Sequence, residues 1–145
     1  MEQGDIPADV LGDLRSNDNE LSVWMVEIDR SNLDSVLVAV ASSRVRLDKL
    51  DYALFDEQVL PKLAIKCVKS EGSTPHVLAN GAMHRDLTEL TAQKVVSLAQ
   101  AMMPLESLRV PEKRIKLMLM AAIQNSVLDR ARIDPQLLAQ LEPLA

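Results

Sequence analysis

The segment 117–123, which reads LMLMAAI, is apolar on every side of the helix that it would form. We expect this helix to begin at Pro111, because a first-turn residue needs no N–H partner, and to continue to about Arg132. A helix without a polar face is either the buried centre of its own domain or half of a subunit interface. Any fold of this chain therefore has to cover this helix.

The composition is that of a chain that folds around a core of its own. Of 145 residues, 48% are hydrophobic and 26% are charged, and the sequence contains neither a repeat nor a long flexible linker. We therefore predict a single domain, residues 1–145. Only Trp24, Tyr52 and Phe55 are aromatic, so aliphatic side chains and methionine fill this core. The chain therefore has few side chains that could stack on nucleic-acid bases.

Charge is concentrated at the N-terminus. Residues 1–29 hold eight acidic side chains against Arg15, a net charge of −7, which leaves +2 for the rest of a chain whose total is −5. No stretch therefore has the dense basic field that nonspecific DNA binding requires. Residues 1–19 contain few apolar side chains, and we predict that this acidic segment is only loosely attached to the fold.

The first half of the chain alternates strand and helix patterns. Short apolar runs predict strands at 21–28, 51–55 and 64–69, the first central and the third at an edge. Helices are expected after Ser31, which with Asp34 resembles a capping box, and near 57–63. Residues 21–69 thus predict a sheet of about three strands with helices, joined by β-α-β crossovers or partly antiparallel.

The second half predicts helices. Apolar residues spaced at about 100° indicate a helix over 83–103, followed by the helix from Pro111 and a short one at 136–142 capped by Asp134. The expected fold class is α+β, or a small α/β fold, in which a helical C-terminal half follows the sheet.

The function that this pattern favours is a non-catalytic protein–protein interaction module, such as an adaptor, an inhibitor or an immunity-type subunit. The apolar helix supplies a contact surface, and the acidic N-terminal segment supplies a field that selects a basic partner. Because a two-fold axis lets one patch cover itself, we expect a homodimer through the 112–131 helix. The interface residues predicted on this basis are Leu117, Met118, Met120 and Val127.

A small enzyme is the first alternative. Asp51, Asp56 and Glu57 bracket the second predicted strand, and carboxylates at a strand end, together with a histidine, are common catalytic groups.

A nucleic-acid-binding regulator is the second alternative, although nucleic acid is the less favoured partner. It would use Lys113, Lys116, Arg130 and Arg132, provided that the 112–132 helix aligns them on one exposed face.

Neither a metal nor a cofactor is expected. His76, His84 and Asp86 match no known ligand spacing, and no glycine-rich phosphate-binding motif occurs. The single cysteine, Cys67, agrees with a reducing compartment, and no run is long enough to cross a bilayer. These features favour a cytoplasmic protein without a membrane partner.

Overall fold

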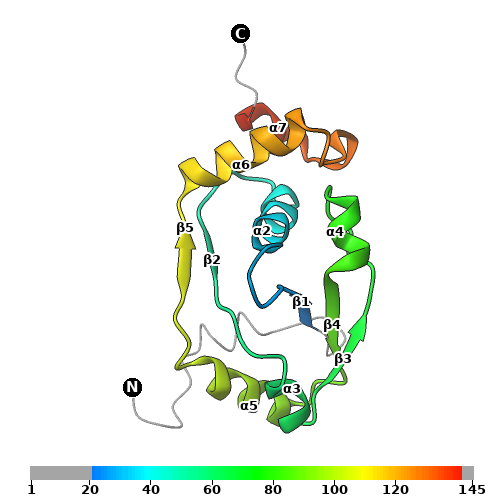
Figure 1. Cartoon of the computed structure of the whole chain (residues 1–145), viewed down its shortest axis with the longest axis vertical. Coiled ribbons are helices and arrows are strands. Elements are labelled where there is room, and N and C mark those ends of the chain that lie inside the picture. Colours follow the sequence, from blue (N-terminus) through cyan, green and yellow to red (C-terminus); the bar gives the residue numbers. More distant parts are fainter. Residues whose placement is uncertain (1–20, 142–145) are drawn as a thin grey trace. The chain divides into compact units, whose positions relative to one another are not determined.

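The computed structural model describes residues 21–141, so the acidic segment 1–19 lies outside the described residues. Helices and two small antiparallel sheets confirm the α+β class (Figure 1). The elements in chain order are β1 (Leu21–Trp24), α2 (Leu33–Ser42), β2 (Leu50–Tyr52), α3 (Val59–Lys62), β3 (Lys66–Lys69), α4 (Val77–Ala82), β4 (His84–Thr88), α5 (Ala92–Met102), β5 (Leu108–Val110), α6 (Glu112–Gln124), the 3₁₀ turn η2 (Arg130–Arg132) and α7 (Pro135–Leu141).

Two compact units make up the chain, and each has its own core. The first unit contains Ala53–Lys69 and Arg85–Ser107, together with the described residues 21–23. Strands β1, β4 and β3 form a sheet in that order, in which Cys67 of β3 pairs with Leu87 of β4. The core of this unit is aliphatic and consists of Leu60, Ile65, Leu87, Leu90, Leu98 and Ala99.

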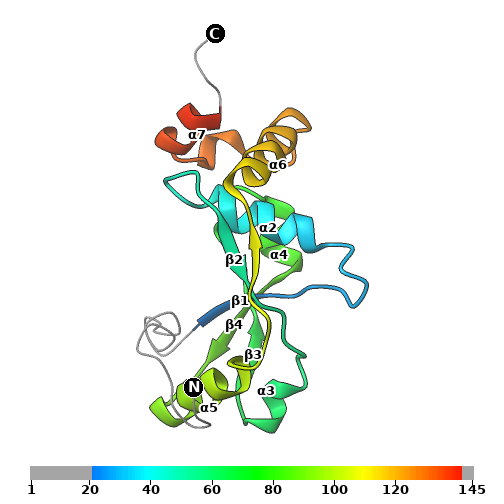
Figure 2. The same cartoon turned by 90° about the vertical axis from the view of Figure 1, so that its left-hand side faces the viewer.

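The second unit contains Trp24–Tyr52, Ser70–His84 and the chain from Leu108 onward. Strands β2 and β5 run side by side as an antiparallel pair, in which Asp51 lies opposite Arg109 (Figure 2). Helix α2 packs against α6 and α4, and α6 packs against α7. The core is again aliphatic and consists of Leu37, Val38, Ala41, Leu50, Val110, Ile115, Leu119, Ala122, Leu128, Ile133, Leu137 and Leu141. The single-domain assignment of residues 1–145 stays a prediction.

The expected strand 21–28 is shorter than predicted and occupies an edge. It ends at Trp24, and β4 takes the central place in the sheet. After Trp24 the chain turns, with Arg30 in a left-handed conformation (φ 60°) and its N–H donating to the carbonyl of Glu27. The apolar residues beyond Trp24 resemble a strand locally, but the turn at 27–30 keeps the strand from reaching the expected end at Ile28.

The prediction of a helix over 83–103 is wrong for the first part of that range. Residues 84–88 form β4, and helix α5 begins only at Ala92. Glu89 adopts a left-handed φ of 56°, which breaks any helix, and the hydroxyl of Thr91 then accepts the N–H of Lys94 as an N-cap. The two buried residues of β4, His84 and Leu87, are three apart, so a helical period fits them as well as a strand does.

The expected strand at 51–55 forms at Leu50–Tyr52 but pairs with β5 instead of joining the three-stranded sheet. The prediction of one sheet from residues 21–69 is therefore wrong in its pairing, because β4 and β5 lie in the second half of the chain. The edge position expected for 64–69 is confirmed by β3. Pro61 is tolerated in α3 because it lies in the first turn, where an N–H has no helical partner.

The expected capping box before α2 does not form. The N-cap is Asn32, and its side chain makes no capping hydrogen bond. Instead, its Oδ1 accepts the N–H of Glu27 at 2.7 Å and its Nδ2 donates to the carbonyl of Met25 at 2.9 Å. Asn32 therefore holds the loop that precedes α2.

Helix α6 ends at Gln124, earlier than the expected Arg132. Ser126 adopts a left-handed φ of 58° and donates its N–H to Ile123, while Val127 donates to the carbonyl of Ala122 at 2.8 Å. These two bonds form a Schellman motif, which satisfies the last carbonyls of the helix. Arg130 and Arg132 consequently lie on η2 and not on the long helix.

Candidate functional site

Helix α6 has one buried face and one exposed face. Ile115, Leu119 and Ala122 are buried in the core of the second unit, where α6 packs against α2. On the opposite side, Leu117 is 60% exposed and Met120 is 39% exposed. The helix that the sequence shows as apolar all round is thus covered on one side only among the described residues.

Met118 is turned by about 100° around α6 from Leu117. It is half-buried and packs against the core cluster of the second unit. Of the four residues predicted for an interface, Leu117, Met120 and Val127 therefore have exposed side chains, whereas Met118 contributes to the core. Leu117 and Met120 are three residues apart, which places them as neighbours on one helix face.

Val127 is 42% exposed and follows the end of α6. It occupies the second position after the cap of the Schellman motif, where a hydrophobic residue often contacts the third-last helical residue, here Ala122. This local packing accounts for an apolar residue in the turn. The remaining exposure of its side chain adds to the apolar surface of α6.

The charges on α6 are confined to its beginning. Lys113 and Arg114 are exposed in the first turn, and Lys116 is the last charged residue before Asp129. Glu112 is the one exposed acidic residue of this first turn, and after it the exposed surface of the helix changes from basic to apolar and then to uncharged polar at Gln124. This polarity gives the two ends of the surface different electrostatic properties.

The second unit holds most of the exposed apolar side chains. Among residues 21–141, seven of the eight large hydrophobic residues with exposed side chains belong to it, Val96 on α5 being the exception. Val77 and Leu78 are two of them and lie in the first turn of α4.

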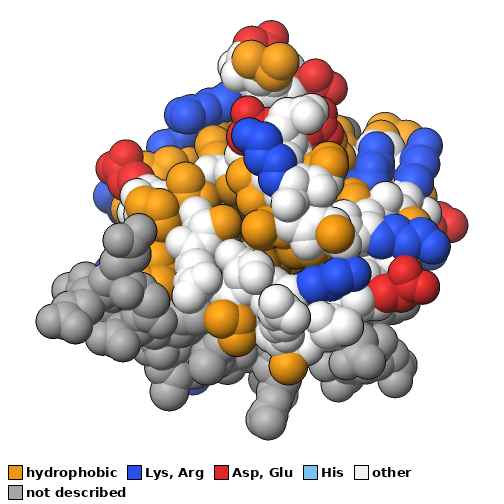
Figure 3. All heavy atoms as spheres, turned by 90° about the horizontal axis from the view of Figure 1, so that it is seen from below, with side chains coloured by type: hydrophobic (Ala, Val, Ile, Leu, Met, Phe, Trp, Pro, Cys, Tyr) orange, Lys and Arg blue, Asp and Glu red, His pale blue; other side chains and the backbone are white. Residues whose placement is uncertain are grey.

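On the side where α3 and α5 of the first unit lie, hydrophobic side chains are interspersed with Lys and Arg side chains (Figure 3).

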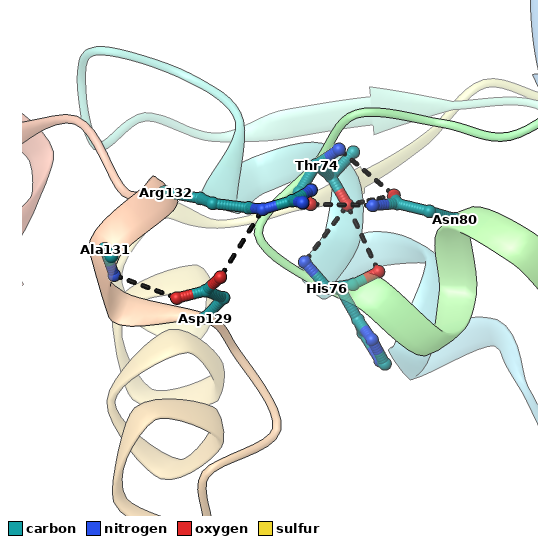
Figure 4. Close-up of polar contacts among 6 residues, drawn as sticks. All are labelled: Thr74, His76, Asn80, Asp129, Ala131 and Arg132. Atoms are coloured by element: carbon teal, nitrogen blue, oxygen red, sulfur yellow. Dashed lines mark hydrogen bonds and ion pairs between the residues drawn. The ribbon is translucent and has the colours of Figure 1, made fainter.

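A buried polar cluster fixes the loop before α4. The Thr74 hydroxyl donates to Asn80 Oδ1 at 2.6 Å, and Asn80 Nδ2 donates to the Thr74 carbonyl at 2.7 Å (Figure 4). The Thr74 N–H also donates to Asn80 Oδ1 at 3.0 Å. Both residues are buried. No sequence pattern indicates their pairing, because the contact depends on the path of the loop between them.

The histidines lie at the two ends of α4. His76 is its N-cap, where Nδ1 accepts the N–H of Ala79 at 3.4 Å, and burial lowers its pKa. At the other end, His84 Nδ1 lies 2.8 Å from the Ser70 hydroxyl, and its ring meets Trp24 edge-on with centroids 4.8 Å apart. A hydroxyl beside an imidazole is the pairing that nucleophilic catalysis uses, but the same contacts fill a half-buried corner of the second unit.

The three carboxylates of the enzyme alternative have other contacts. Asp51 forms a bidentate ion pair with Arg109, whose Nε and terminal nitrogen donate to the two carboxylate oxygens at 2.7 and 3.1 Å. This pair lowers the pKa of Asp51 and keeps the carboxylate charged. Asp56 accepts the N–H of Gln58 at 2.9 Å in the turn before α3. Asp56 and Glu57 belong to the first unit, whereas Asp51 and both histidines belong to the second.

The basic residues of the nucleic-acid alternative do not share one helix. Lys113 and Lys116 are on α6, whereas Arg130 and Arg132 are on η2. Arg132 also forms an ion pair with Asp129 at 3.4 Å (Figure 4). The single aligned face that this alternative requires is therefore not formed by α6.

Between residues 21 and 141, no three His, Cys, Asp or Glu side chains gather in a way that could hold a metal ion. None of the helices in that range is both long enough and apolar enough for a bilayer span. Comparison with known proteins found no matching family model, curated protein or solved structure. The arrangement of the side chains is thus the basis for any functional assignment.

Proposed function

We propose that this chain is a non-catalytic protein–protein interaction module, an adaptor, inhibitor or immunity-type subunit, whose contact surface is the exposed face of α6. The observation that carries the proposal is the 60% exposure of Leu117 on a helix whose opposite face is core. Burial of a Leu or Met side chain contributes about 1.5–3 kcal/mol, so Leu117 and Met120 gain when a partner covers them. Apolar anchors of this kind commonly lie at the centre of interfaces.

The first partner to consider is a second copy, because a two-fold axis covers the same patch on both chains. The net charge of −7 in residues 1–29 would favour a basic surface on any other partner. A cytoplasmic location, which the single cysteine favours, is part of this proposal.

The proposal is tested with Leu117→Glu, which places a carboxylate at the centre of the surface. We expect a folded protein with a native circular dichroism spectrum that no longer associates with its partner. Light scattering coupled to size exclusion measures self-association, with twice the 16.0 kDa of one chain expected for the wild type. Affinity capture from the native cells measures association with other proteins.

The matched control is Ile28→Glu. Ile28 is a fully exposed aliphatic residue in the loop before α2, so the chemical change is the same outside α6. We expect this variant to behave as the wild type does. If folded Leu117→Glu retains the mass and the captured proteins of the wild type, α6 is not the contact surface and the proposal fails.

A further inference from the structure

The exposed stripe of α6 is asymmetric along the helix. Its side chains recur at helical spacing and include both basic residues and a small one: Lys113, Arg114, Leu117, Met120, Ala121 and Gln124. The basic residues occupy the N-terminal end of the stripe, and its C-terminal end is uncharged. The exposed Glu112 lies beside the stripe, because its helical neighbours at three and four residues are Ile115 and Lys116. The helix dipole adds partial negative charge at that C-terminal end. The two ends of the stripe are therefore electrostatically complementary.

We propose that the partner of this face is a second copy of the chain, and that the two α6 helices lie antiparallel. This inference rests on the proposed function of the same face. A parallel pair would bring Lys113 and Arg114 of one copy against the same residues of the other, and like charges in close contact are unfavourable. An antiparallel pair places them beside Gln124 and the negative end of the other helix.

The stripe also has the shape that such a pair needs. In the antiparallel arrangement Leu117 of one copy meets Met120 and Ala121 of the other, because these residues lie on either side of the middle of the helix. Packed helices approach to about 8–10 Å between axes, and a small residue such as Ala121 permits the closer approach. The turn that carries Val127 comes to the level of the exposed Pro111.

Disulfide cross-linking tests the orientation in a Cys67→Ser background, which removes the only native thiol. Lys113→Cys and Gln124→Cys are purified separately, and one of them carries an affinity tag. The rise of about 1.5 Å per residue separates positions 113 and 124 by about 16 Å along the helix. A disulfide requires Cα atoms about 4.4–6.8 Å apart, so only facing positions can join.

We expect the mixture of both variants to form a cross-linked heterodimer several-fold faster than either variant cross-links with itself. Ile28→Cys in the same background measures cross-linking by random collision and should stay at that low level. Faster self-cross-linking of each variant would show a parallel pair and overturn the inference. A dimer by mass in which the mixture does not exceed the collision control would place the interface elsewhere and overturn it too.

Separate measurements decide whether this inference and the proposed function hold. If light scattering at micromolar concentration gives the mass of one chain, the second copy is excluded and this inference fails. The comparison of Leu117→Glu with Ile28→Glu in affinity capture then still decides whether the α6 face binds a different protein. Loss of capture by Leu117→Glu alone supports the proposed function without the homodimer.

Discussion

The backbone N–H of Asp129 donates a 2.7 Å hydrogen bond to the carbonyl oxygen of Pro75. This bond ties the turn after α6 to the loop before α4, within the second unit. The loop is in turn held by the buried pair of Thr74 and Asn80. The loop before α4 is thus fixed at Thr74 by a buried side-chain pair and at Pro75 by the turn that follows α6.

Asn80→Ala should strongly destabilise the protein. Asn80 is 1% exposed, and its removal leaves the N–H and carbonyl groups of Thr74 without their buried partner, while the Thr74 hydroxyl keeps its contacts with the His76 backbone. We expect a loss of about 2–3 kcal/mol in the free energy of unfolding, since each unsatisfied buried group costs about 1–3 kcal/mol. Urea denaturation of the variant and of Gln100→Ala, a control at an exposed position of α5 outside the α6 face, measures this difference. Equal midpoints would show that the cluster contributes little.

The two glycines of the second unit should respond oppositely to alanine. A Cβ at Gly72 would lie 3.0 Å from Asn80 Oδ1 and 3.3 Å from the ring of His84, both buried, so Gly72→Ala should destabilise the protein. A Cβ at Gly81 meets nothing within 4 Å.

Because Gly81 lies in α4, Gly81→Ala should raise the free energy of unfolding by about 0.5–1 kcal/mol. Thermal unfolding of both variants measures the two effects. A lower melting temperature for Gly81→Ala than for Gly72→Ala would contradict the packing around the polar cluster.

Stability should fall on mild acidification because of His76. Burial lowers the pKa of His76 from its ordinary 6.5, and Nδ1 can accept the N–H of Ala79 only while that nitrogen is unprotonated. Below about pH 6.5 the unfolded chain binds a proton that the folded chain excludes, so stability decreases as the pH falls toward the lower folded pKa. Above that range the contribution of the neutral imidazole is fully present.

The control for this effect is His76→Asn. Asparagine is a favoured N-cap and has no titrating group, so it should keep the cap while removing the proton linkage. Denaturation midpoints between about pH 5 and 7.5 compare the two proteins, since carboxylates titrate mostly below this range. An unchanged pH dependence in His76→Asn would assign the effect to another group.

Several elements follow from local sequence alone. Helix α2 forms where its aliphatic run predicts it, and α7 begins at Pro135, where the side chain of Asp134 accepts the N–H of Gln136 at 2.8 Å. The apolar, edge-like pattern of residues 64–69 also predicted correctly that β3 is an edge strand. In these cases the signals are contained within a few adjacent residues, and nothing elsewhere in the chain overrides them.

Tertiary structure decided the rest. Residues 84–88 form a strand because β3 pairs with them, and β2 pairs with β5 across more than fifty residues of sequence. The apolar run of α6 indicates that cover is needed but not on which side, and only packing against α2 separates the buried Leu119 from the exposed Leu117. Likewise, Thr74 and Asn80 meet only because the loop folds back. Periodicity records how residues repeat along one element, whereas strand pairing and burial depend on residues that are distant in the chain.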